Sequence, residues 1–204
     1  MIDPLASIGD LVGSTPRAEL PRKRLLEHLD GDEYVLKIDN SSLEYLANQG
    51  LNIEKDKNVI DYIDKNRNKE IRYYIMGKVG TGKTLLAKQI CFWRKKLFVK
   101  ITPDNLSKIT SEDIFSWYEN VDVIIFDDLG AEMLSEREKA GKILLTISRY
   151  LENSDKGLII TTNLNSDDLR EYYSDRIFDR IIGQLKILKL NQPSYRKQNM
   201  EIIK

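Results

Sequence analysis

The chain has 204 residues, of which 41% are hydrophobic and 31% are charged, which indicates a globular protein with one α/β core and excludes a disordered polypeptide. Lys and Arg together number 32, as do Asp and Glu, so the formal net charge is zero and gives no overall sign of nucleic-acid binding. The single cysteine, Cys91, and the single histidine, His28, exclude an internal disulfide and a metal site built from clustered cysteines or histidines.

The first part of the chain predicts little regular structure. Residues 1–33 carry three of the five prolines and only weak periodicity, which predicts an irregular N-terminal arm with a short helix near residues 22–29. A capping box from Ser41 to Glu44 predicts a short helix, and a second helix is expected over residues 56–66. We therefore expect an arm over residues 1–33 and one folded domain over residues 34–204.

Residues 77–84 read GKVGTGKT and fit the pattern G-x-x-x-x-G-K-[ST] at every fixed position. A strand-like stretch, residues 71–76, precedes this motif, and a helix-like stretch, residues 85–90, follows it. This context predicts a loop whose backbone N–H groups surround the phosphates of ATP at a helix N-terminus; the alternative is a Gly-rich turn before an ordinary helix. Lys83 would reach the β- and γ-phosphates, and the hydroxyl of Thr84 would bind Mg²⁺. The predicted nucleotide-binding residues are Gly77, Lys78, Val79, Gly80, Thr81, Gly82, Lys83, Thr84 and Leu85.

The rest of the chain alternates between strand-like and helix-like segments. Strands are expected at residues 97–101, 121–126, 158–162 and 185–190, and helices from Ser111, over residues 135–151 and after a cap at Ser166. Such alternation is typical of a parallel sheet with helices on both faces. The predicted fold class is therefore α/β, in the three-layer arrangement of P-loop NTPases.

The strand around residues 121–126 ends in two carboxylates, Asp127 and Asp128, followed by Leu129 and Gly130. We expect this strand to lie beside the phosphate loop, with its carboxyl end directed at the metal. Asp127 would hold Mg²⁺ through water, and Asp128 would orient and deprotonate the attacking water. The alternative is a pair of turn-forming aspartates before a glycine.

Five segments in order make the motifs more specific: GKVGTGKT, IIFDDLGAE, LIITTNL, SDRIFDR and PSYRK, which begin at residues 77, 124, 158, 174 and 193. This order resembles the AAA+ ATPases of the DnaC/DnaI group of bacterial and phage helicase loaders. The DDLGAE stretch, Asp127 to Glu132, is especially similar to the DnaI branch, and IstB-type ATPases are related. The resemblance covers approximately residues 35–200.

The resemblance implies roles for four further residues. Asn163 is similar to the sensor 1 residue, a polar side chain that contacts the γ-phosphate or the attacking water; the alternative is an ordinary turn asparagine. Arg176 and Arg180 match the two arginines of the arginine-finger helix, with Arg180 as the finger that reaches a neighbouring subunit and Arg176 as its support. Their i, i+4 spacing by itself suggests an anionic partner, part of which Asp179 could supply. Arg196 is similar to the sensor 2 arginine, although a solvated surface arginine is the alternative.

Two departures from the family pattern affect the expected activity. Many AAA+ proteins carry Glu where this chain has Asp128, so we expect slow ATP hydrolysis that suits a switch. Only 14 residues follow the last expected strand, which predicts that the full C-terminal helical lid is lacking, as in loaders of this group.

DNA contacts have two candidate segments, Arg94-Lys95-Lys96 and Arg22-Lys23-Arg24, although each suits a solvated helix end better. Three aromatic residues on the helix from Ser111 could stack on bases, but their spacing favours the core: Phe115, Trp117 and Tyr118.

The resemblance implies an ATPase that self-associates through the arginine finger and acts on a replicative DNA helicase and single-stranded DNA. No apolar run approaches the roughly 20 residues that span a bilayer, so we expect a cytoplasmic protein without a membrane partner. One alternative is an IstB-like transposition ATPase that binds duplex DNA. Another is a nucleotide-gated adaptor in which ATP binding, and not turnover, is the signal.

Overall fold

A computed structural model describes residues 55–191 of the chain. The predicted arm over residues 1–33, the capping-box helix after Ser41, the Arg22-Lys23-Arg24 segment and Arg196 lie outside the described residues. The domain boundary at residue 34 and the missing lid therefore stay predictions. Within residues 55–191, no helix is long and apolar enough to cross a bilayer.

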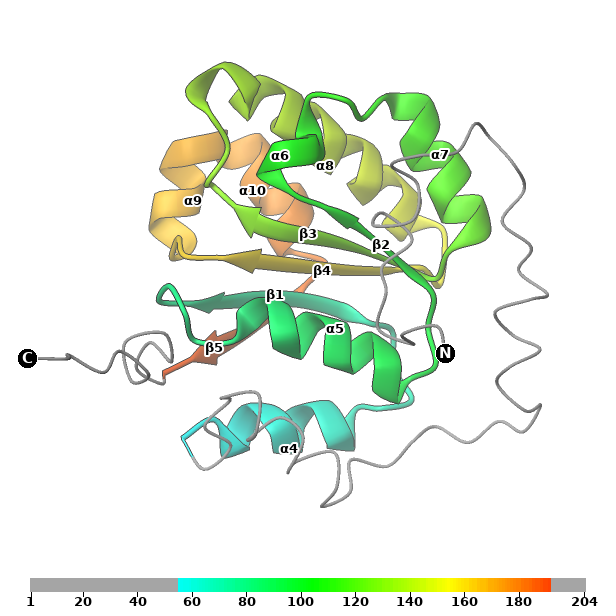
Figure 1. The fold of residues 1–204 in the computed structure, drawn as a ribbon, viewed down its shortest axis with the longest axis vertical. Coiled ribbons are helices and arrows are strands. Elements are labelled where there is room, and N and C mark those ends of the chain that lie inside the picture. Colours follow the sequence, from blue (N-terminus) through cyan, green and yellow to red (C-terminus); the bar gives the residue numbers. More distant parts are fainter. Residues whose placement is uncertain (1–54, 192–204) are drawn as a thin grey trace, which may run out of the picture.

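Five parallel strands form one sheet in the order β2-β3-β4-β1-β5, which confirms the predicted parallel sheet (Figure 1). The strands are β1 (Arg72–Gly77), β2 (Phe98–Ile101), β3 (Val123–Leu129), β4 (Gly157–Thr162) and β5 (Lys186–Leu190). Because β4 is the central strand, all six of its residues are buried. All five strands point the same way, so their carboxyl ends meet at one edge of the sheet, on the left in Figure 1.

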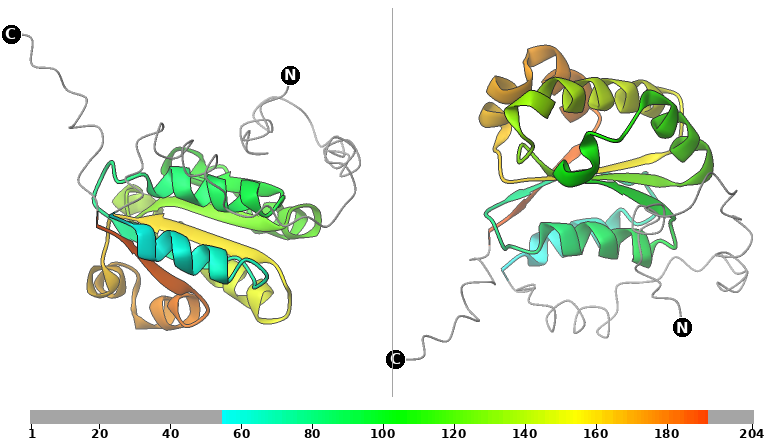
Figure 2. Two further views of the ribbon diagram at one scale, coloured as in Figure 1. Left: turned by 90° about the horizontal axis from the view of Figure 1, so that it is seen from below. Right: turned by 45° about the horizontal axis from the view of Figure 1, so that its top comes forward.

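Helices cover both faces of the sheet, which confirms the three-layer α/β arrangement (Figure 2). One face is covered by α4 (Lys57–Lys65) and α5 (Lys83–Trp93). The other face is covered by α6 (Pro103–Leu106), α7 (Ser111–Asn120), α8 (Arg137–Glu152), α9 (Ser166–Tyr173) and α10 (Asp175–Ile182). A short 3-10 turn, η2 (Leu134–Glu136), leads into α8.

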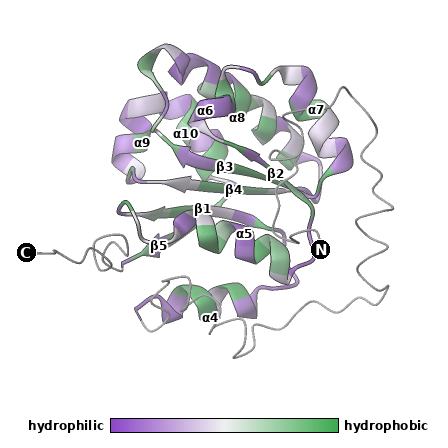
Figure 3. Ribbon diagram, viewed as in Figure 1, coloured by the Kyte–Doolittle hydropathy of each residue, from purple (hydrophilic) through white to green (hydrophobic). Residues whose placement is uncertain are grey.

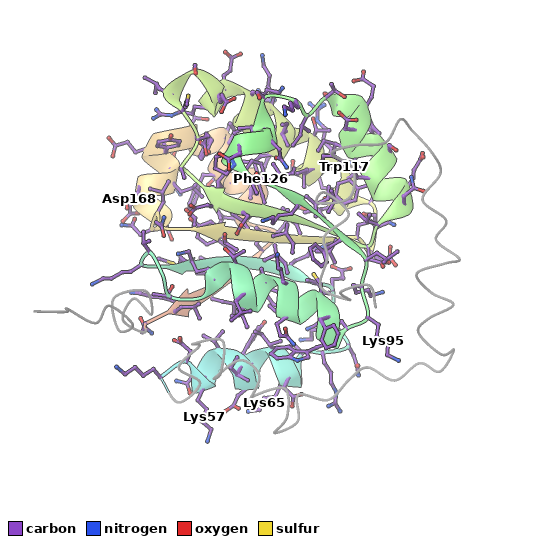
Figure 4. The ribbon with its side chains drawn as sticks, viewed as in Figure 1. Lys57, Lys65, Lys95, Trp117, Phe126 and Asp168 are labelled. Atoms are coloured by element: carbon purple, nitrogen blue, oxygen red, sulfur yellow. The ribbon has the colours of Figure 1, made fainter. Side chains whose placement is uncertain are left out.

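Each face of the sheet has its own hydrophobic core. On the α5 side, Leu86, Ile90 and Trp93 repeat at i, i+4 and i+7, and all three are buried against the sheet as the spacing predicts. The strand β3 is hydrophobic up to Phe126 and then carries the hydrophilic Asp127 and Asp128 before its last residue, Leu129 (Figure 3). Phe126, the last apolar residue before the two aspartates, is fully enclosed beneath the helices of the second face (Figure 4). Packing on both faces therefore fixes the strand end that carries the acidic pair.

The helix after β4 begins one residue earlier than predicted. The cap of α9 is Asn165 and not Ser166, because the Asn165 side chain accepts hydrogen bonds from the backbone N–H groups of Asp167 and Asp168. The helical segment then breaks at Ser174, which has a φ of 84°, and continues as α10. The two matched arginines thus lie on a short helix of their own.

Candidate active site

The glycine-rich loop joins β1 to α5 at the carboxyl edge of the sheet, as predicted. Gly80 and Gly82 have φ values of 79° and 84°, a backbone conformation that glycine adopts without steric cost. A Cβ atom on Gly77 would lie 2.9 Å from the backbone oxygen of Leu190, so the strand end also requires glycine. The loop therefore has glycine where it turns sharply into the helix N-terminus, and a helix N-terminus is suited to binding an anion.

Lys83 is the first residue of α5 and is only 7% exposed. Its ammonium donates hydrogen bonds to the backbone oxygens of Gly77, at 2.9 Å, and Lys78, at 3.0 Å. It also donates to the side-chain oxygen of Asn163, at 2.7 Å. The structure therefore brings together Lys83 and Asn163, two residues that lie 80 positions apart in the sequence.

Asp127 reaches the loop although its strand does not pair with β1. The neighbours of β1 are β4 and β5, so β4 separates β3 from the strand that leads into the loop, yet the end of β3 lies beside the loop as expected. The Thr84 hydroxyl donates to Oδ1 of Asp127 at 2.7 Å, and the hydroxyl of Thr161, on the intervening strand, donates to the same oxygen at 2.7 Å. Thr161, from the strand between β3 and β1, therefore holds the Asp127 carboxylate next to Thr84.

Asp128 lies in a β-bulge. The register with β4 shifts between Phe126 and Leu129, because β3 has one more residue than its partner there. Asp128 consequently has a φ of 56°, and its N–H donates to the Thr161 hydroxyl at 2.9 Å. The amide nitrogen of Asn163 donates to Oδ1 of Asp128 at 3.1 Å. Asn163 thus contacts both the loop lysine and the second acidic residue.

Two residues that were not predicted as part of the site touch Asp127. Thr161 is one, and its place at the end of a buried strand, two residues before Asn163, was an available signal. Lys100 on β2 is the other: its Nζ atom lies 3.7 Å from Oδ2 of Asp127. No motif marks Lys100, because the contact depends on the lateral pairing of β2 with β3.

Glu132, which the sequence marks only as the last residue of the DDLGAE stretch, fixes the turn that follows the acidic pair. It is 5% exposed, and its Oε2 accepts the N–H of Gly130 at 2.8 Å. Its Oε1 accepts a hydrogen bond from the Tyr173 hydroxyl, and its backbone oxygen accepts one from Tyr172 at 3.3 Å. Burial and the neighbouring Glu132 carboxylate raise the pKa of Tyr173, so this hydroxyl remains a donor. The turn after the acidic pair is therefore fixed to the end of α9.

Arg176 and Arg180 are exposed on α10. Asp179, which could have supplied their anionic partner, is instead 3.5 Å from Arg170. Within residues 55–191, neither Arg176 nor Arg180 forms an ion pair or contacts the glycine loop by a hydrogen bond. The structure does not join these arginines to the site within one chain, so their predicted role in a neighbouring subunit stays a prediction.

The candidate DNA segment at the end of α5 is in part structural. Arg94 is 8% exposed, and its guanidinium donates to the backbone oxygens of Lys69, at 2.6 Å, and Asn66, at 3.1 Å, and to the Tyr73 hydroxyl, at 2.9 Å. Both the DNA contact and the solvated helix end are therefore wrong for Arg94. Lys95 lies just beyond it, at the outer end of α5 (Figure 4).

The aromatic residues of α7 divide between core and surface. Tyr118 is 2% exposed and stacks on Tyr150 with ring centroids 4.9 Å apart. Phe115 is 44% exposed and Trp117 is partly buried against the core. The preference for core is confirmed for Tyr118 and wrong for Phe115.

The residues present fit a nucleoside triphosphate with Mg²⁺. The cradle offers backbone N–H groups, a helix N-terminus and the Lys83 ammonium, which are donors suited to phosphate oxygens. Thr84 and Asp127, 2.7 Å apart, offer a hydroxyl and a carboxylate, the hard oxygen donors that Mg²⁺ uses beside phosphates. Asp128 and Asn163, whose side chains are 3.1 Å apart, add a second carboxylate and an amide next to this pair.

The amino-acid sequence is similar to those of two curated helicase loaders. The chain is similar to the "Replicative helicase loader DnaC" of Escherichia coli (strain K12), with 27% identity over 140 residues, 62% of this chain and 56% of the relative. The DnaC of Buchnera aphidicola subsp. Baizongia pistaciae is 29% identical over 149 residues, 65% of this chain and 60% of the relative. The chain therefore spans little more than half the length of these curated relatives. The narrower resemblance to the DnaI branch stays a prediction.

A solved structure supports the fold. The AMPPCP-bound DnaA from Aquifex aeolicus aligns with a TM-score of 0.50 and 22% identity, over 70% of this chain and 49% of that chain. This likeness concerns the fold, which is that of P-loop AAA+ proteins. A family model described as Novel STAND NTPase 3 matches residues 57–199, which is more than half of the chain. The chain that carries this glycine loop and acidic strand end belongs to the Novel STAND NTPase 3 family.

Proposed function

We propose that this chain is an ATP-binding and ATP-hydrolysing protein of DNA replication that loads a hexameric replicative helicase. The observation that carries the ATPase part is the pair of contacts Thr84–Asp127, at 2.7 Å, and Lys83–Asn163, also at 2.7 Å. The similarity to DnaC, whose printed name is replicative helicase loader, supports the loading part. We place the activity in the cytoplasm, where such a helicase works.

In this proposal the glycine loop binds the triphosphate. Backbone N–H groups of residues 77–85 and the Lys83 ammonium contact the phosphates, and the N-terminus of α5 adds its positive dipole end. Thr84 and Asp127 would hold Mg²⁺, which would supply positive charge to neutralise the phosphates. Arg196 would contact the nucleotide from beyond the described residues, as in the resemblance on which it rests.

Hydrolysis is assigned to the acidic residue of the bulge. Asp128 accepts a proton from the attacking water, and Asn163, whose amide nitrogen lies 3.1 Å from Oδ1 of Asp128, orients that carboxylate. The oxygen of the same amide accepts a hydrogen bond from Lys83, so one side chain aligns the base with the phosphate-binding lysine. This arrangement supports positioning and charge stabilisation as the main sources of catalysis.

Self-association would complete the site. Arg180 is exposed on α10 and is proposed to reach the γ-phosphate held by a second copy, with Arg176 as its support. Mixing two inactive variants tests this. Lys83→Ala removes nucleotide binding and Arg180→Ala removes the finger, so mixed oligomers should regain turnover at interfaces where an intact Lys83 faces an intact Arg180. Mixtures as inactive as either variant alone would contradict a role in trans.

The helicase partner is tested directly. The full chain, immobilised through a tag, is exposed to the hexameric replicative helicase of its host with Mg-ATP, with Mg-ADP and without nucleotide, and Lys83→Ala serves as the control. We expect helicase retention with Mg-ATP in the wild type, and loss of the nucleotide dependence in Lys83→Ala. No retention in any condition, with normal ATP binding, would contradict the loading function and leave the ATPase intact.

The same material distinguishes the two alternatives. ATPase activity stimulated by single-stranded DNA supports the loader, whereas stimulation by duplex DNA with filament formation supports an IstB-like ATPase. ATP-dependent partner binding that Asp128→Asn leaves unaltered supports a nucleotide-gated adaptor.

A further inference from the structure

Lys100 places a positive charge beside the carboxylate that the proposed function assigns to Mg²⁺. Lys100 lies on β2, where it pairs in register with Ile125 of β3. Its Nζ atom is 3.7 Å from Oδ2 of Asp127, and the two side chains are 19% and 10% exposed. The ion pair is therefore largely shielded from solvent. Charges in such a shielded setting interact more strongly than charges at an open surface.

The two oxygens of Asp127 have different partners. Oδ1 accepts hydrogen bonds from the hydroxyls of Thr84 and Thr161, both at 2.7 Å. Oδ2 faces the Lys100 ammonium. The threonines thus fix the orientation of the carboxylate without help from Lys100, and Lys100 contributes charge at the remaining oxygen. Its removal would leave the hydroxyl contacts in place.

We propose that Lys100 competes with Mg²⁺ for Asp127 and so sets the Mg²⁺ concentration at which the site takes up Mg-nucleotide. An ammonium and a divalent cation are alternative counter-ions of one carboxylate, and they repel each other when both are near it. The same ammonium attracts the triphosphate itself, since it adds positive charge next to the phosphate cradle. Lys100 therefore favours metal-free nucleotide and disfavours the metal. This inference rests on the proposed ATP site and goes beyond it.

A role in orienting Asp127 makes the opposite prediction. If Lys100 served mainly to hold the carboxylate for the metal, its removal would raise the Mg²⁺ requirement. If Lys100 competes, its removal lowers that requirement and also weakens nucleotide binding in the absence of Mg²⁺. The two measurements together separate the roles, because loss of structure alone would weaken both kinds of binding.

The experiment uses the full chain and its variants Lys100→Met, Lys100→Arg and Lys186→Met. Lys186 is exposed at the first position of β5, at the edge of the sheet opposite the carboxyl ends, so its replacement makes the same charge change away from the site. A fluorescent ATP analogue is bound at fixed concentration while Mg²⁺ is titrated, and its affinity is also measured in EDTA. Circular dichroism and a thermal melt check that each variant is folded.

We expect Lys100→Met to lower the Mg²⁺ midpoint by about 3- to 10-fold and to weaken binding in EDTA by a similar factor, at moderate ionic strength. Lys100→Arg and Lys186→Met should each stay within about 2-fold of the wild type in both measurements. An unchanged or higher midpoint in a folded Lys100→Met that binds nucleotide overturns this inference alone. A wild type that binds no nucleotide at any Mg²⁺ concentration overturns the proposed function and this inference with it.

Discussion

The ammonium of Lys83 and the amide oxygen of Asn163 lie 2.7 Å apart, which joins the glycine loop to the end of β4. The amide nitrogen of Asn163 lies 3.1 Å from Oδ1 of Asp128. A neutral amide is suited to this position because it can donate to the carboxylate and accept from the ammonium at the same time. One side chain therefore relates the phosphate-binding residue to the proposed base.

Asn163→Ala should reduce ATP turnover by about 10- to 100-fold, because it removes one positioned polar group from the site. Affinity for the nucleotide should change by less than about 3-fold, since the loop and Lys83 remain. The measurement is steady-state ATPase activity beside equilibrium binding of a fluorescent ATP analogue. Asn153→Ala, at an exposed turn asparagine after α8, is the matched control. Equal losses in binding and turnover would contradict a role confined to hydrolysis.

Asp127→Asn and Asp128→Asn should have different effects. Asp127→Asn removes the charge next to Thr84, so we expect Mg²⁺-dependent tightening of nucleotide binding to be lost along with turnover. Asp128→Asn should retain Mg²⁺-dependent binding and reduce turnover by about 100-fold, because a proton acceptor is removed. Turnover and Mg²⁺-dependent affinity are measured for both variants. Wild-type turnover in Asp128→Asn would show that the base is another group.

Arg94→Ala should destabilise the fold by about 2–3 kcal/mol, because it leaves three buried or partly buried acceptors without their charged donor. The exposed Lys96, two residues later, gives the control Lys96→Ala, for which we expect a change within about 0.5 kcal/mol. Urea denaturation of each variant measures the free energy of unfolding. Equal stability of the two variants would contradict the structural role of Arg94.

Cys91 should not react with thiol reagents while the protein is folded. The residue is fully enclosed, and burial raises the pKa of its thiol, so the reactive thiolate is disfavoured. At pH 8, we expect labelling by an aromatic disulfide reagent only as fast as the chain unfolds, and one equivalent at once in denaturant. Rapid labelling of the native protein would contradict the placement of Cys91.

The raised pKa of Cys91 also determines the direction in which stability changes with pH. A thiol whose pKa is higher in the folded than in the unfolded state contributes fully to stability below the unfolded value. That contribution falls as pH rises above the ordinary thiol pKa of about 8.5, because only the unfolded chain then loses its proton. Cys91→Ala should reduce the loss of stability between pH 8 and pH 10, measured by denaturation at each pH.

The sequence predicted the parts of the fold that follow from periodicity. The apolar run of β3 and the i, i+4, i+7 repeat of Leu86, Ile90 and Trp93 both required burial, and both are buried. The sequence was less decisive about the residue at which a helix begins. Asn165 and Ser166 are both good caps, and only the observed hydrogen bonds distinguish them.

The motifs predicted the main residues of the site, but not the contacts that neighbouring strands make with them. Thr161 and Lys100 touch Asp127 from the two strands that flank β3, and strand order is not written in the spacing of any motif. No motif indicates the β-bulge either, although the bulge bears on why residue 128 is Asp. At a φ of 56°, Asp and Asn are tolerated better than most side chains, and Glu is not among the favoured residues.

The buried contact between Glu132 and Tyr173 has a mechanical consequence. Tyr173 ends α9, and the unusual backbone of Ser174 starts α10, which carries Arg176 and Arg180. Glu132 holds the Tyr173 hydroxyl with one oxygen and the N–H of Gly130 with the other. Tyr173 is therefore connected, through one carboxylate, to the backbone two residues beyond Asp128. The Glu132 side chain thus links the end of α9, next to the helix that carries the arginines, to the turn that follows the acidic pair.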